Sequence, residues 1–286
     1  MLQVGFVTCA TVQDLTPDDQ LAFAELAARD VTARPVLWDD PSIEWQGFDA
    51  LVLRSTWDYH HRSAEFRAWL DRIEAAGARL FNPPATVRWN MHKRYLANLA
   101  ERGLPVVPTA WLEQGETADL YTLMKARGWE RAVVKPAISA SAHNTWTTTG
   151  FEAPDQQARL DDLLGRSDVL VQPFMEEVQT EGEWSLLFFG RQYSHAVLKR
   201  PAEGDFRVQN EYGGGYVAAQ PEPETVAQAA AVLAAVEGPL VYARVDGVVR
   251  AGIFTLMELE LIEPYLFLGT HPGAAARFAA TILEAL

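Results

Sequence analysis

The first part of the chain alternates between short apolar runs and longer amphipathic stretches. Apolar and β-branched residues predict four buried strands, at residues 4–8, 36–38, 50–53 and 79–81. A first helix is expected after Thr16, which suits the N-cap position, with Pro17 in its first turn. A second, amphipathic helix is expected over residues 65–76, before Gly77. This β-α-β-β-α-β order predicts a small, mostly parallel sheet covered by helices.

The pattern changes at Pro83-Pro84, which marks a linker because proline interrupts both helices and strands. The helices expected beyond it lie at residues 85–102, 118–127, 155–164, 224–236 and 274–286. The strands expected beyond it lie at residues 109–112, 131–136, 168–175, 183–189 and 192–199, the last two as a hairpin. The chain is therefore expected to have an α/β (α+β) fold.

A second hairpin, with its turn near residues 250–252, is unusually acidic. In an extended chain alternate side chains share a face, so Glu258 and Glu260 point the same way, and Asp246 on the partner strand can reach that face. The intervening residues are expected to face the core: Met257, Leu259 and Leu261. Three converging carboxylates repel each other unless a cation lies between them, and Mg²⁺ or Mn²⁺ prefers such oxygen ligands. The alternative is a solvated acidic face in an acidic protein.

Composition narrows the possible partners. The 286 residues are 49% hydrophobic and 22% charged, as in ordinary globular proteins, and the net charge of −14 argues against a nucleic-acid or anionic-membrane surface. A single cysteine, Cys9, excludes an internal disulfide framework and a cysteine-rich zinc site. The six histidines show no metal-ligand spacing, since His60-His61 is an adjacent pair. With no signal-peptide pattern or apolar run of membrane-spanning length, a cytoplasmic protein is expected.

A polar segment, Arg-Ser-Thr-Trp-Asp-Tyr at residues 54–59, follows the third predicted strand. Ligands of open α/β sheets bind beyond the carboxyl ends of strands, where this segment lies. Arg54 can hold a substrate carboxylate through two hydrogen bonds, and Ser55 or Thr56 can add hydroxyl donors. The alternative is an internally hydrogen-bonded loop anchored by Trp57.

Lysine and arginine residues from separate segments supply candidate anion ligands. Lys135 ends an apolar strand, where its charge is costly without a partner such as phosphate. The small, polar loop that follows, residues 137–144, can bring backbone N–H groups to a phosphate chain, although it lacks glycine. Lys93, Lys199 and Arg207 are further candidates, each of which taken alone is more often a surface charge.

The order of these elements and charges resembles the ATP-grasp superfamily, which includes glutathione synthetase, D-alanine–D-alanine ligase and the ribosomal-protein glutamate ligases. The resemblance covers roughly the last 200 residues in motif detail and the first 80 in layout. It implies an ATP-grasp fold with an N-terminal Rossmann-like pre-ATP-grasp domain at residues 1–83. A central subdomain at 84–172 and a C-terminal subdomain with the metal site at 173–286 would follow.

The resemblance also assigns roles to individual residues. Lys93 and Lys135 match the two ATP-binding lysines of the family, and the segment that holds adenine is matched by Gln172, Pro173 and Phe174. Glu183 stands where the family has an acid close to the ribose, and Lys199 and Arg207, the latter in Gly-Asp-Phe-Arg, match basic residues near the transferred phosphate. The metal positions, with the family's spacing of 12 and then 2, are matched by Asp246, Glu258 and Glu260.

Two features depart from the family pattern. Glu260 stands where asparagine is common, and the glycines of the phosphate loop are replaced by Ser139, Ala140, Ser141 and Ala142. Glu263 follows on the opposite face from Glu260 and is expected to be structural rather than a metal ligand. Within the superfamily, residues 54–59 and the segment Met-Glu-Leu-Glu-Leu-Ile-Glu-Pro look most like the O-ureido-serine cyclo-ligases of cycloserine biosynthesis, and hence of antibiotic biosynthesis and amino-acid metabolism.

The resemblance implies an ATP-dependent ligase with Mg²⁺ or Mn²⁺. A substrate carboxylate would attack the γ-phosphate to give an acyl phosphate, and an amine would then displace phosphate; Lys135, Lys199 and Arg207 would assist catalysis. Arg54, Ser55 and Asp58 would orient a small amino-acid-like substrate. The product can be an amide, a peptide or a ring, and the protein can be a homo-oligomer like many relatives. The alternatives are a regulatory protein that binds ATP without catalysis, and a scaffold.

Motifs of other nucleotide-binding classes are missing from the sequence. There is no Gly-x-Gly-x-x-Gly after the first strand and no Gly-Lys-Ser/Thr motif, which disfavours dinucleotide binding and P-loop chemistry.

Overall fold

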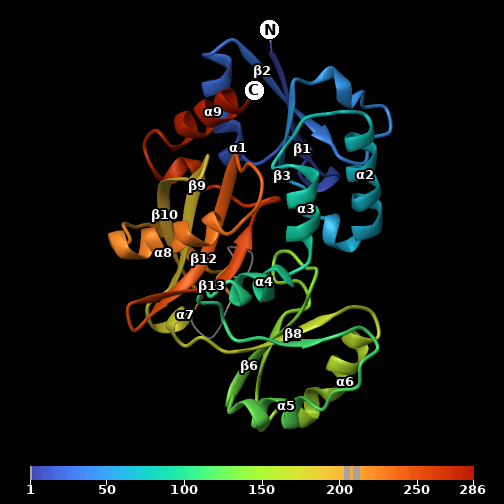
Figure 1. Cartoon of the computed structure of the whole chain (residues 1–286), viewed down its shortest axis with the longest axis vertical. Helices are drawn as coiled ribbons and strands as arrows, with labels where there is room; N and C mark the ends of the chain where they lie inside the picture. Colours follow the sequence, from blue (N-terminus) through green and yellow to red (C-terminus); the bar gives the residue numbers. More distant parts are fainter. Residues whose placement is uncertain (1, 203–206, 209–212) are drawn as a thin grey trace.

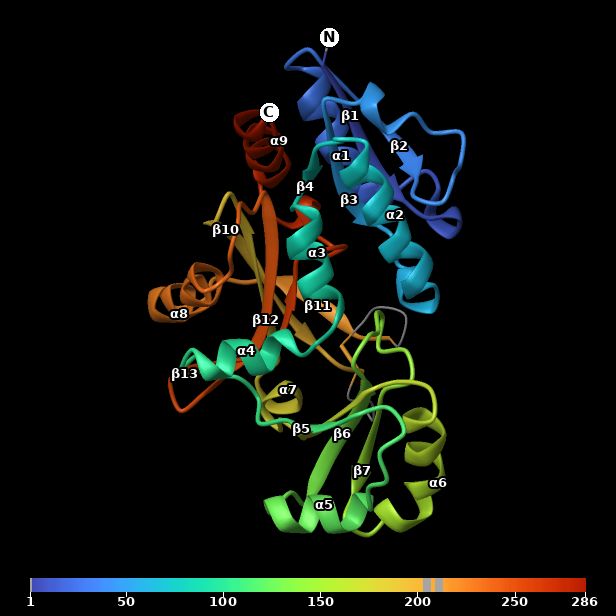
Figure 2. The same ribbon diagram turned by 45° about the vertical axis from the view of Figure 1, so that its right-hand side comes forward.

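Three sheets follow one another along the chain in the computed structural model, which describes residues 2–202, 207–208 and 213–286. The first sheet lies at one end of the molecule together with both chain termini, and the second forms a separate lobe at the other end (Figures 1 and 2). The third sheet lies between them. No helix among the described residues is long and apolar enough to cross a membrane.

The first sheet confirms the predicted β-α-β-β-α-β layout. Its order is β2-β1-β3-β4, with all pairs parallel. The strands are β1 (Leu2–Thr8), β2 (Val31–Leu37), β3 (Ala50–Ser55) and β4 (Leu80–Phe81), and the helices are α1 (Pro17–Ala27) and α2 (Ser63–Ala75). The hydroxyl of Thr16 accepts a hydrogen bond from the backbone N–H of Asp19 at 3.1 Å, so Thr16 is the N-cap of α1, as predicted.

The second sheet is antiparallel, in the order β5-β8-β6-β7. Its strands are β5 (Ala110–Leu112), β6 (Arg131–Pro136), β7 (Trp146–Thr149) and β8 (Val169–Pro173). Two amphipathic helices, α5 (Leu120–Arg127) and α6 (Ala153–Leu164), pack against it in one apolar cluster. The sequence analysis missed β7, because three of its four residues are threonines and its apolar signal is weak.

The third sheet, in the order β11-β10-β9-β12-β13, is also antiparallel. Its strands are β9 (Glu183–Phe189), β10 (Gln192–Arg200), β11 (Gly215–Ala218), β12 (Tyr242–Arg250) and β13 (Ile253–Glu260). The remaining α-helices are α3 (Pro84–Met91), α4 (Tyr95–Glu101), α7 (Glu177–Thr180), α8 (Pro223–Ala234) and α9 (Ala274–Ala285). The helix expected over residues 85–102 is thus divided into α3 and α4.

The first and third sheets share one apolar core through α9. The ring of Phe278 in α9 lies 6.4 Å from that of Phe6 in β1 and 5.1 Å from that of Phe189 in β9. The divisions 1–83, 84–172 and 173–286 remain a prediction. The shared core implies that the first and third of these regions depend on each other for stability.

An irregularity in the β12–β13 pair changes one predicted side-chain direction. Asp246 pairs with Glu258, but Gly247 pairs with Leu256, so Met257 is an extra residue on β13. A bulge of this kind breaks the simple alternation of side chains. Leu259 and Leu261 are buried in the core as expected, whereas Met257 is only partly buried and lines a cavity, so its predicted direction is wrong.

At Gly247, on β12, the neighbouring atoms leave no space for a side chain. A Cβ atom there would lie 2.4 Å from the carbonyl oxygen of Thr255 and 2.7 Å from the ring of Phe254. We expect Gly247→Ala to lower the free energy of unfolding by about 1–3 kcal/mol, because the backbone must shift to admit a methyl group. Urea unfolding measures this change. Gly215→Ala on β11, where a Cβ meets nothing within 4 Å, is the control and should cost less than about 0.5 kcal/mol. Equal losses in the two variants would contradict the prediction.

Candidate functional site

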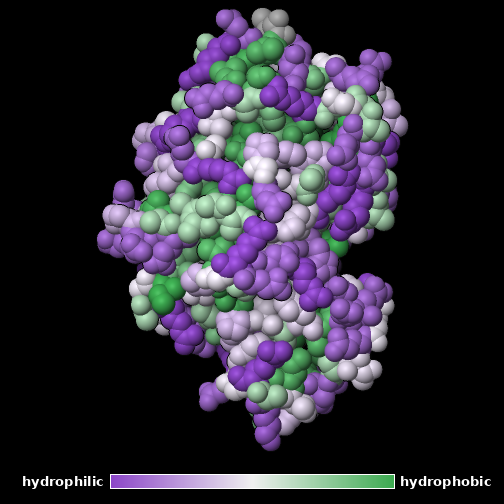
Figure 3. All heavy atoms as spheres, in the orientation of Figure 1, coloured by the Kyte–Doolittle hydropathy of each residue, from purple (hydrophilic) through white to green (hydrophobic). Residues whose placement is uncertain are grey.

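A cavity of about 290 Å³ lies between the second and third sheets and reaches the turn after β3. The space-filling view shows the surface hollowed between the lobe that carries β5–β8 and the rest of the molecule (Figure 3). The charged residues that line the cavity are Lys93, Lys135, Glu183, Lys199, Arg207, Arg244, Asp246, Glu258, Glu260 and Glu263. Eight of the fifteen site residues predicted from the sequence are therefore in this group, brought together from distant segments.

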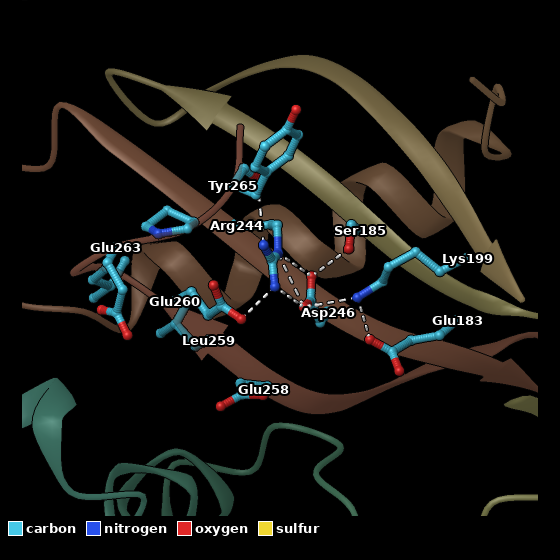
Figure 4. A network of polar contacts seen from close by, with 12 residues as sticks. Glu183, Ser185, Lys199, Arg244, Asp246, Glu258, Leu259, Glu260, Glu263 and Tyr265 are labelled. Atoms are coloured by element: carbon cyan, nitrogen blue, oxygen red, sulfur yellow. Dashed lines mark hydrogen bonds and ion pairs between the residues drawn. The ribbon is translucent and has the colours of Figure 1, made fainter. Parts of the chain in front are cut away.

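Asp246, at the centre of β12, organises a buried ion network (Figure 4). Its carboxylate accepts hydrogen bonds from the Ser185 hydroxyl at 2.7 Å, the Arg244 guanidinium at 2.9 Å and the Lys199 ammonium at 3.1 Å. Lys199 also pairs with Glu183 at 2.5 Å, and Arg244 with Glu260. Burial alone would raise the pKa of Asp246, but the two cations outweigh it and lower the pKa to about 2.

The three predicted metal ligands do not converge in the expected way. Asp246 lies directly opposite Glu258 in the strand register, but in the described structure the three acids do not bring three oxygens within 4.8 Å of one another. The guanidinium of Arg244 lies between Asp246 and Glu260 (Figure 4). The sequence analysis gave Arg244 no role. Its position two residues before Asp246, on the same strand face, was the available signal.

The carboxylates nevertheless fit a divalent cation. They offer oxygen donors only, which is the chemistry of a hard ion, and the side chains of Glu258 and Glu260 remain 32% and 24% exposed toward the cavity. Burial raises the pKa of Glu260 to about 7 although Arg244 opposes the shift, and the charges of Asp246 and Glu258 add to the effect of burial. A cation here would relieve this crowding of negative charge.

The two candidate phosphate lysines have different surroundings. The ammonium of Lys93 is buried, pairs with Glu258 at 2.8 Å and donates to the carbonyl oxygen of Ser139 at 3.0 Å. Within the described part of the chain, Lys135 forms no hydrogen bond or ion pair. Burial lowers the pKa of Lys135, against the opposing charge of Glu258. A partly buried lysine whose ammonium has no partner among the described residues indicates an anion from outside.

Apolar residues form the part of the cavity next to these cations. Pro173 and Phe174 line it, and the Arg131 guanidinium stacks on the Phe174 ring at 3.6 Å. The amide of Gln172 is buried and donates to the Thr109 hydroxyl at 2.9 Å. The apolar lining continues with Val107, Val133, Met175, Val178, Val208 and Met257. This part of the cavity is a slot with apolar walls, and the role expected for segment 172–174, which is to hold adenine, stays a prediction.

Arg207, from the Gly-Asp-Phe-Arg motif, also lines the cavity. The other residues of the motif, 204–206, lie outside the described residues.

The polar segment after β3 is placed differently from the prediction. Arg54 is buried, and its guanidinium donates to Asp19 at 2.7 Å and to the carbonyl oxygen of Pro264. The other predicted substrate ligands also lie outside the cavity lining: Ser55 donates to Asp19, Asp58 accepts from Trp38, and Thr56 is fully buried. Arg54 and Ser55 point into the packed protein because β3, which contains them, is buried along its whole length, as is usual for a parallel strand. Asp58 lies beyond β3, is partly exposed and also pairs with Arg62 at 3.8 Å. The geometry does not support direct substrate contacts for the four.

The neighbours of those residues line the cavity instead. Trp57 and Tyr59 belong to an aromatic group with Tyr216, Tyr265 and Phe267. Glu263 lies beside them, and burial raises its pKa to about 8. The expectation that Glu263 faces away from the acidic residues is therefore wrong, because the chain turns after β13 ends at Glu260.

Comparisons with known proteins agree with this geometry. Residues 4–82 match the family described as the N-terminal domain of D-cycloserine synthetase DcsG. The chain is 36% identical over 270 residues to the cycloserine biosynthesis protein DcsG of Streptomyces lavendulae, covering 90% of this chain and 89% of that protein. The crystal structure of D-cycloserine synthetase DcsG superposes with a TM-score of 0.88 at 32% identity, covering 99% of both chains.

A more distant similarity shows the fold alone. The D-alanine–D-alanine ligase of Bacillus anthracis gives a TM-score of 0.72 at 16% identity, covering 99% of this chain and 97% of that one. Its structure in complex with ATP gives a TM-score of 0.71. The ATP-grasp fold expected from the sequence is confirmed.

The ion network makes a prediction about stability. We expect Asp246→Asn to lower the free energy of unfolding by about 3–5 kcal/mol, because it leaves the buried cations Arg244 and Lys199 without their shared carboxylate. Asp162→Asn is the control, since Asp162 pairs with Arg166 on the surface and should contribute less than about 1 kcal/mol. Chemical denaturation measures both. Similar effects in the two variants would mean that the network contributes no more than a surface pair.

Proposed function

Because the chain belongs to the D-cycloserine synthetase (DcsG) family of ATP-grasp ligases, which are ATP-dependent enzymes that form carbon–nitrogen bonds, we propose that it closes an amino acid into a ring. The proposed substrate is an O-ureido-serine, and the proposed product is a cycloserine-type ring. The protein would then act in antibiotic biosynthesis. The family membership and the charged cavity leave no support for a regulatory protein that only binds ATP.

The observation that carries the proposal is Lys135, a partly buried lysine that lines the cavity and whose ammonium has no hydrogen-bond or ion-pair partner among residues 2–202, 207–208 and 213–286. An apolar slot at residues 172–174 and the acidic hairpin also line this cavity. ATP has the matching order of groups, with an apolar base, a polyanionic chain and a reacting γ-phosphate. The charge of Lys135 is compensated when a phosphate oxygen lies beside it.

We assign the nucleotide contacts accordingly. Pro173 and Phe174 would hold adenine, and Glu183 would lie near the ribose. Lys93 and Lys135 would neutralise the α- and β-phosphates, with Lys199 and Arg207 near the γ-phosphate. Arg244 is added to the cations predicted from the sequence. The proposal requires Lys93 and Arg244 to exchange a carboxylate partner for a phosphate oxygen, which both can do because each also lines the cavity.

A divalent cation, Mg²⁺ in preference to Mn²⁺, would be held by Glu258, Glu260 and Asp246. When bound, it would supply positive charge that stabilises the phosphate oxygens during transfer. Asp246 has an additional part, since it anchors Arg244 and Lys199 in the cavity wall.

The aromatic group beside Glu263 is the proposed place for the amino acid. Trp57, Tyr59 and Tyr265 present rings toward which an ammonium group is attracted, and Glu263 can accept its hydrogen bonds. An ammonium group there would favour the ionised form of Glu263, whose pKa is raised to about 8. These residues replace Arg54, Ser55, Thr56 and Asp58 as the proposed substrate contacts.

The chemistry then needs no nucleophile from the protein. A carboxylate oxygen of the substrate attacks the γ-phosphorus, and the bond to the β-phosphate breaks, which gives ADP and an acyl phosphate. The nitrogen bonded to the side-chain oxygen attacks the acyl carbon, loses a proton to solvent and expels phosphate, which closes a ring that still carries the carbamoyl group. Hydrolysis of that group, with water as the co-reactant, would release carbon dioxide and ammonia and leave the cycloserine-type ring. Lys199, Arg207 and Arg244 would balance the negative charge that develops in the phosphoryl-transfer and ring-closing steps.

Lys135→Met tests the nucleotide assignment. We expect the dissociation constant for ATP to rise by about 10–100-fold, because a charged hydrogen bond contributes about 1.5–3 kcal/mol. The melting temperature should stay equal or rise, since no protein group loses a partner. Calorimetric titration and a thermal melt measure the two quantities. Unchanged ATP affinity would remove Lys135 from the site, and a large fall in melting temperature would show that its role is structural.

A coupled ADP assay tests the reaction itself. The panel would hold both enantiomers of O-ureido-serine, D-serine and D-alanine, with Mg²⁺, with Mn²⁺ and with a chelator. We expect ADP only with an O-ureido-serine and a divalent cation, together with a cyclic product detected by mass spectrometry. Glu258→Gln should lower kcat by about 10²–10³-fold.

Glu237→Gln, on a side chain that is 88% exposed, is the matched control and should retain the parent rate. ADP formation by Glu258→Gln at the parent rate would rule out the assigned mechanism. ATP binding without turnover on any member of the panel would rule out the proposed substrate class.

A further inference from the structure

Three histidines meet beside the cavity, although their spacing in the sequence gave no indication of a metal site. His60 and His61 lie in the short helical turn η3 (Tyr59–His61), which follows β3. His143 lies in the loop between β6 and β7. One ligand nitrogen from each ring can be chosen so that all three atoms lie within 4.8 Å of one another. Among the described residues, no other group of three or more histidine, cysteine or acidic side chains does so.

The rings are packed closely. Their centroids are 3.8 Å apart for His60 and His61, 4.7 Å for His61 and His143, and 5.4 Å for His60 and His143. Two nitrogens bound to one tetrahedral Zn²⁺ ion would be about 3.3 Å apart, so only small ring rotations are needed. His61 and His143 are exposed, which leaves them free to rotate and gives an ion access from solvent.

The ring nitrogens of His60 lack hydrogen-bond partners among the described residues. Both of its ring nitrogens are shielded from solvent, and neither forms a hydrogen bond of normal geometry with the described residues. A buried polar group without a partner is costly, and the other two rings lie where a shared ion would satisfy it.

We propose that His60, His61 and His143 form a binding site for one divalent transition-metal ion, with a fourth position open to water. Imidazole nitrogens select zinc, copper, nickel or cobalt over magnesium, so this site is chemically distinct from the carboxylates of the acidic hairpin. The site would join the turn after β3 to the β6–β7 loop.

The β6–β7 loop, which carries His143, forms one wall of the cavity. Ser139, Ala140, Ser141, Ala142 and Thr145 line it. Three residues of this loop, Ser141, Ala142 and Asn144, have φ between 49° and 53°, a left-handed conformation that glycine adopts more easily. The loop is thus held in a conformation of raised energy, and an ion on His143 would oppose its relaxation. A bound ion would therefore slow the movement of this loop, and with it the exchange of nucleotide. The effect on nucleotide exchange rests on the proposed function, whereas the metal site does not.

Binding is tested with Zn²⁺ and Co²⁺ on the nucleotide-free protein. Excess Mg²⁺ keeps the carboxylates occupied. We expect one Zn²⁺ per chain by calorimetric titration, and visible absorption of four-coordinate Co²⁺. His61→Ala and His143→Ala should each weaken binding by more than about tenfold, since even a group that only supports a ligand contributes that much. Both residues are exposed, so folding should be retained, and a thermal melt checks this.

His271→Ala is the matched control, because His271 is exposed and contacts Arg277 instead. It should bind Zn²⁺ like the parent protein. Absence of binding, or equal binding by the parent and His143→Ala, would overturn the site.

The effect on the loop is tested by stopped-flow mixing with a fluorescent ATP analogue. Zn²⁺ should slow association and dissociation several-fold in the parent protein and leave His143→Ala unchanged. If the parent protein binds Zn²⁺ but its association and dissociation rates do not change, the effect on the loop is overturned while the metal site stands. Failure of the analogue to bind at all would contradict the nucleotide assignment and, with it, the proposed effect of the ion on nucleotide exchange.

Discussion

Charge balance around Asp246 is the constraint on which the cavity depends. A carboxylate that is 1% exposed would be strongly destabilising alone, yet here it joins Arg244 of the same strand, Ser185 of β9 and Lys199 of β10. Removing any one partner leaves a buried charge, so the side chains hold one another in place. The same network reaches Glu183 and Glu260 at its two edges, where the charges open to the cavity. Stability and ligand binding therefore depend on the same residues, and a ligand has to enter a network that is already balanced.

Much of the fold could be predicted from the sequence because its signals are local. Thr16 with Pro17 begins α1, a short apolar run defines β1, and alternating apolar and polar residues define the end of the β12–β13 hairpin. The features that were missed depend on tertiary contacts. β7 is a polar strand that exists because β6 supplies its hydrogen bonds, and the extra residue Met257 follows from the space available at Gly247. Neither leaves a pattern along the chain that could be distinguished from a loop or a regular strand.

The candidate site was predictable to the extent that order along the chain carries information. Lysines, arginine and acids at family spacing were predicted to form a phosphate and metal region, and the structure places these residues around one cavity. Spacing alone says nothing about side-chain partners, so the saturation of Arg54 by Asp19 and Pro264 could not be foreseen. The same holds for the position of Arg244 between two acids, and for the approach of His143 to His60 across the loop.

The buried arginines Arg54 and Arg244 show how side-chain partners decide whether a residue can face a ligand. Both lie on strands and are buried, but Arg54 is fully engaged by protein atoms, whereas Arg244 also faces the cavity. By tying β3 to the segment after β13, Arg54 brings Trp57 close enough for its indole N–H to donate to the Glu263 carbonyl oxygen at 3.1 Å. This contact fixes one wall of the aromatic region relative to the acidic hairpin. Arg54 thus helps to set the distance between the rings and the ion network. Under the proposed function, Asp19, which holds Arg54 from α1, would influence substrate binding without lining the cavity itself.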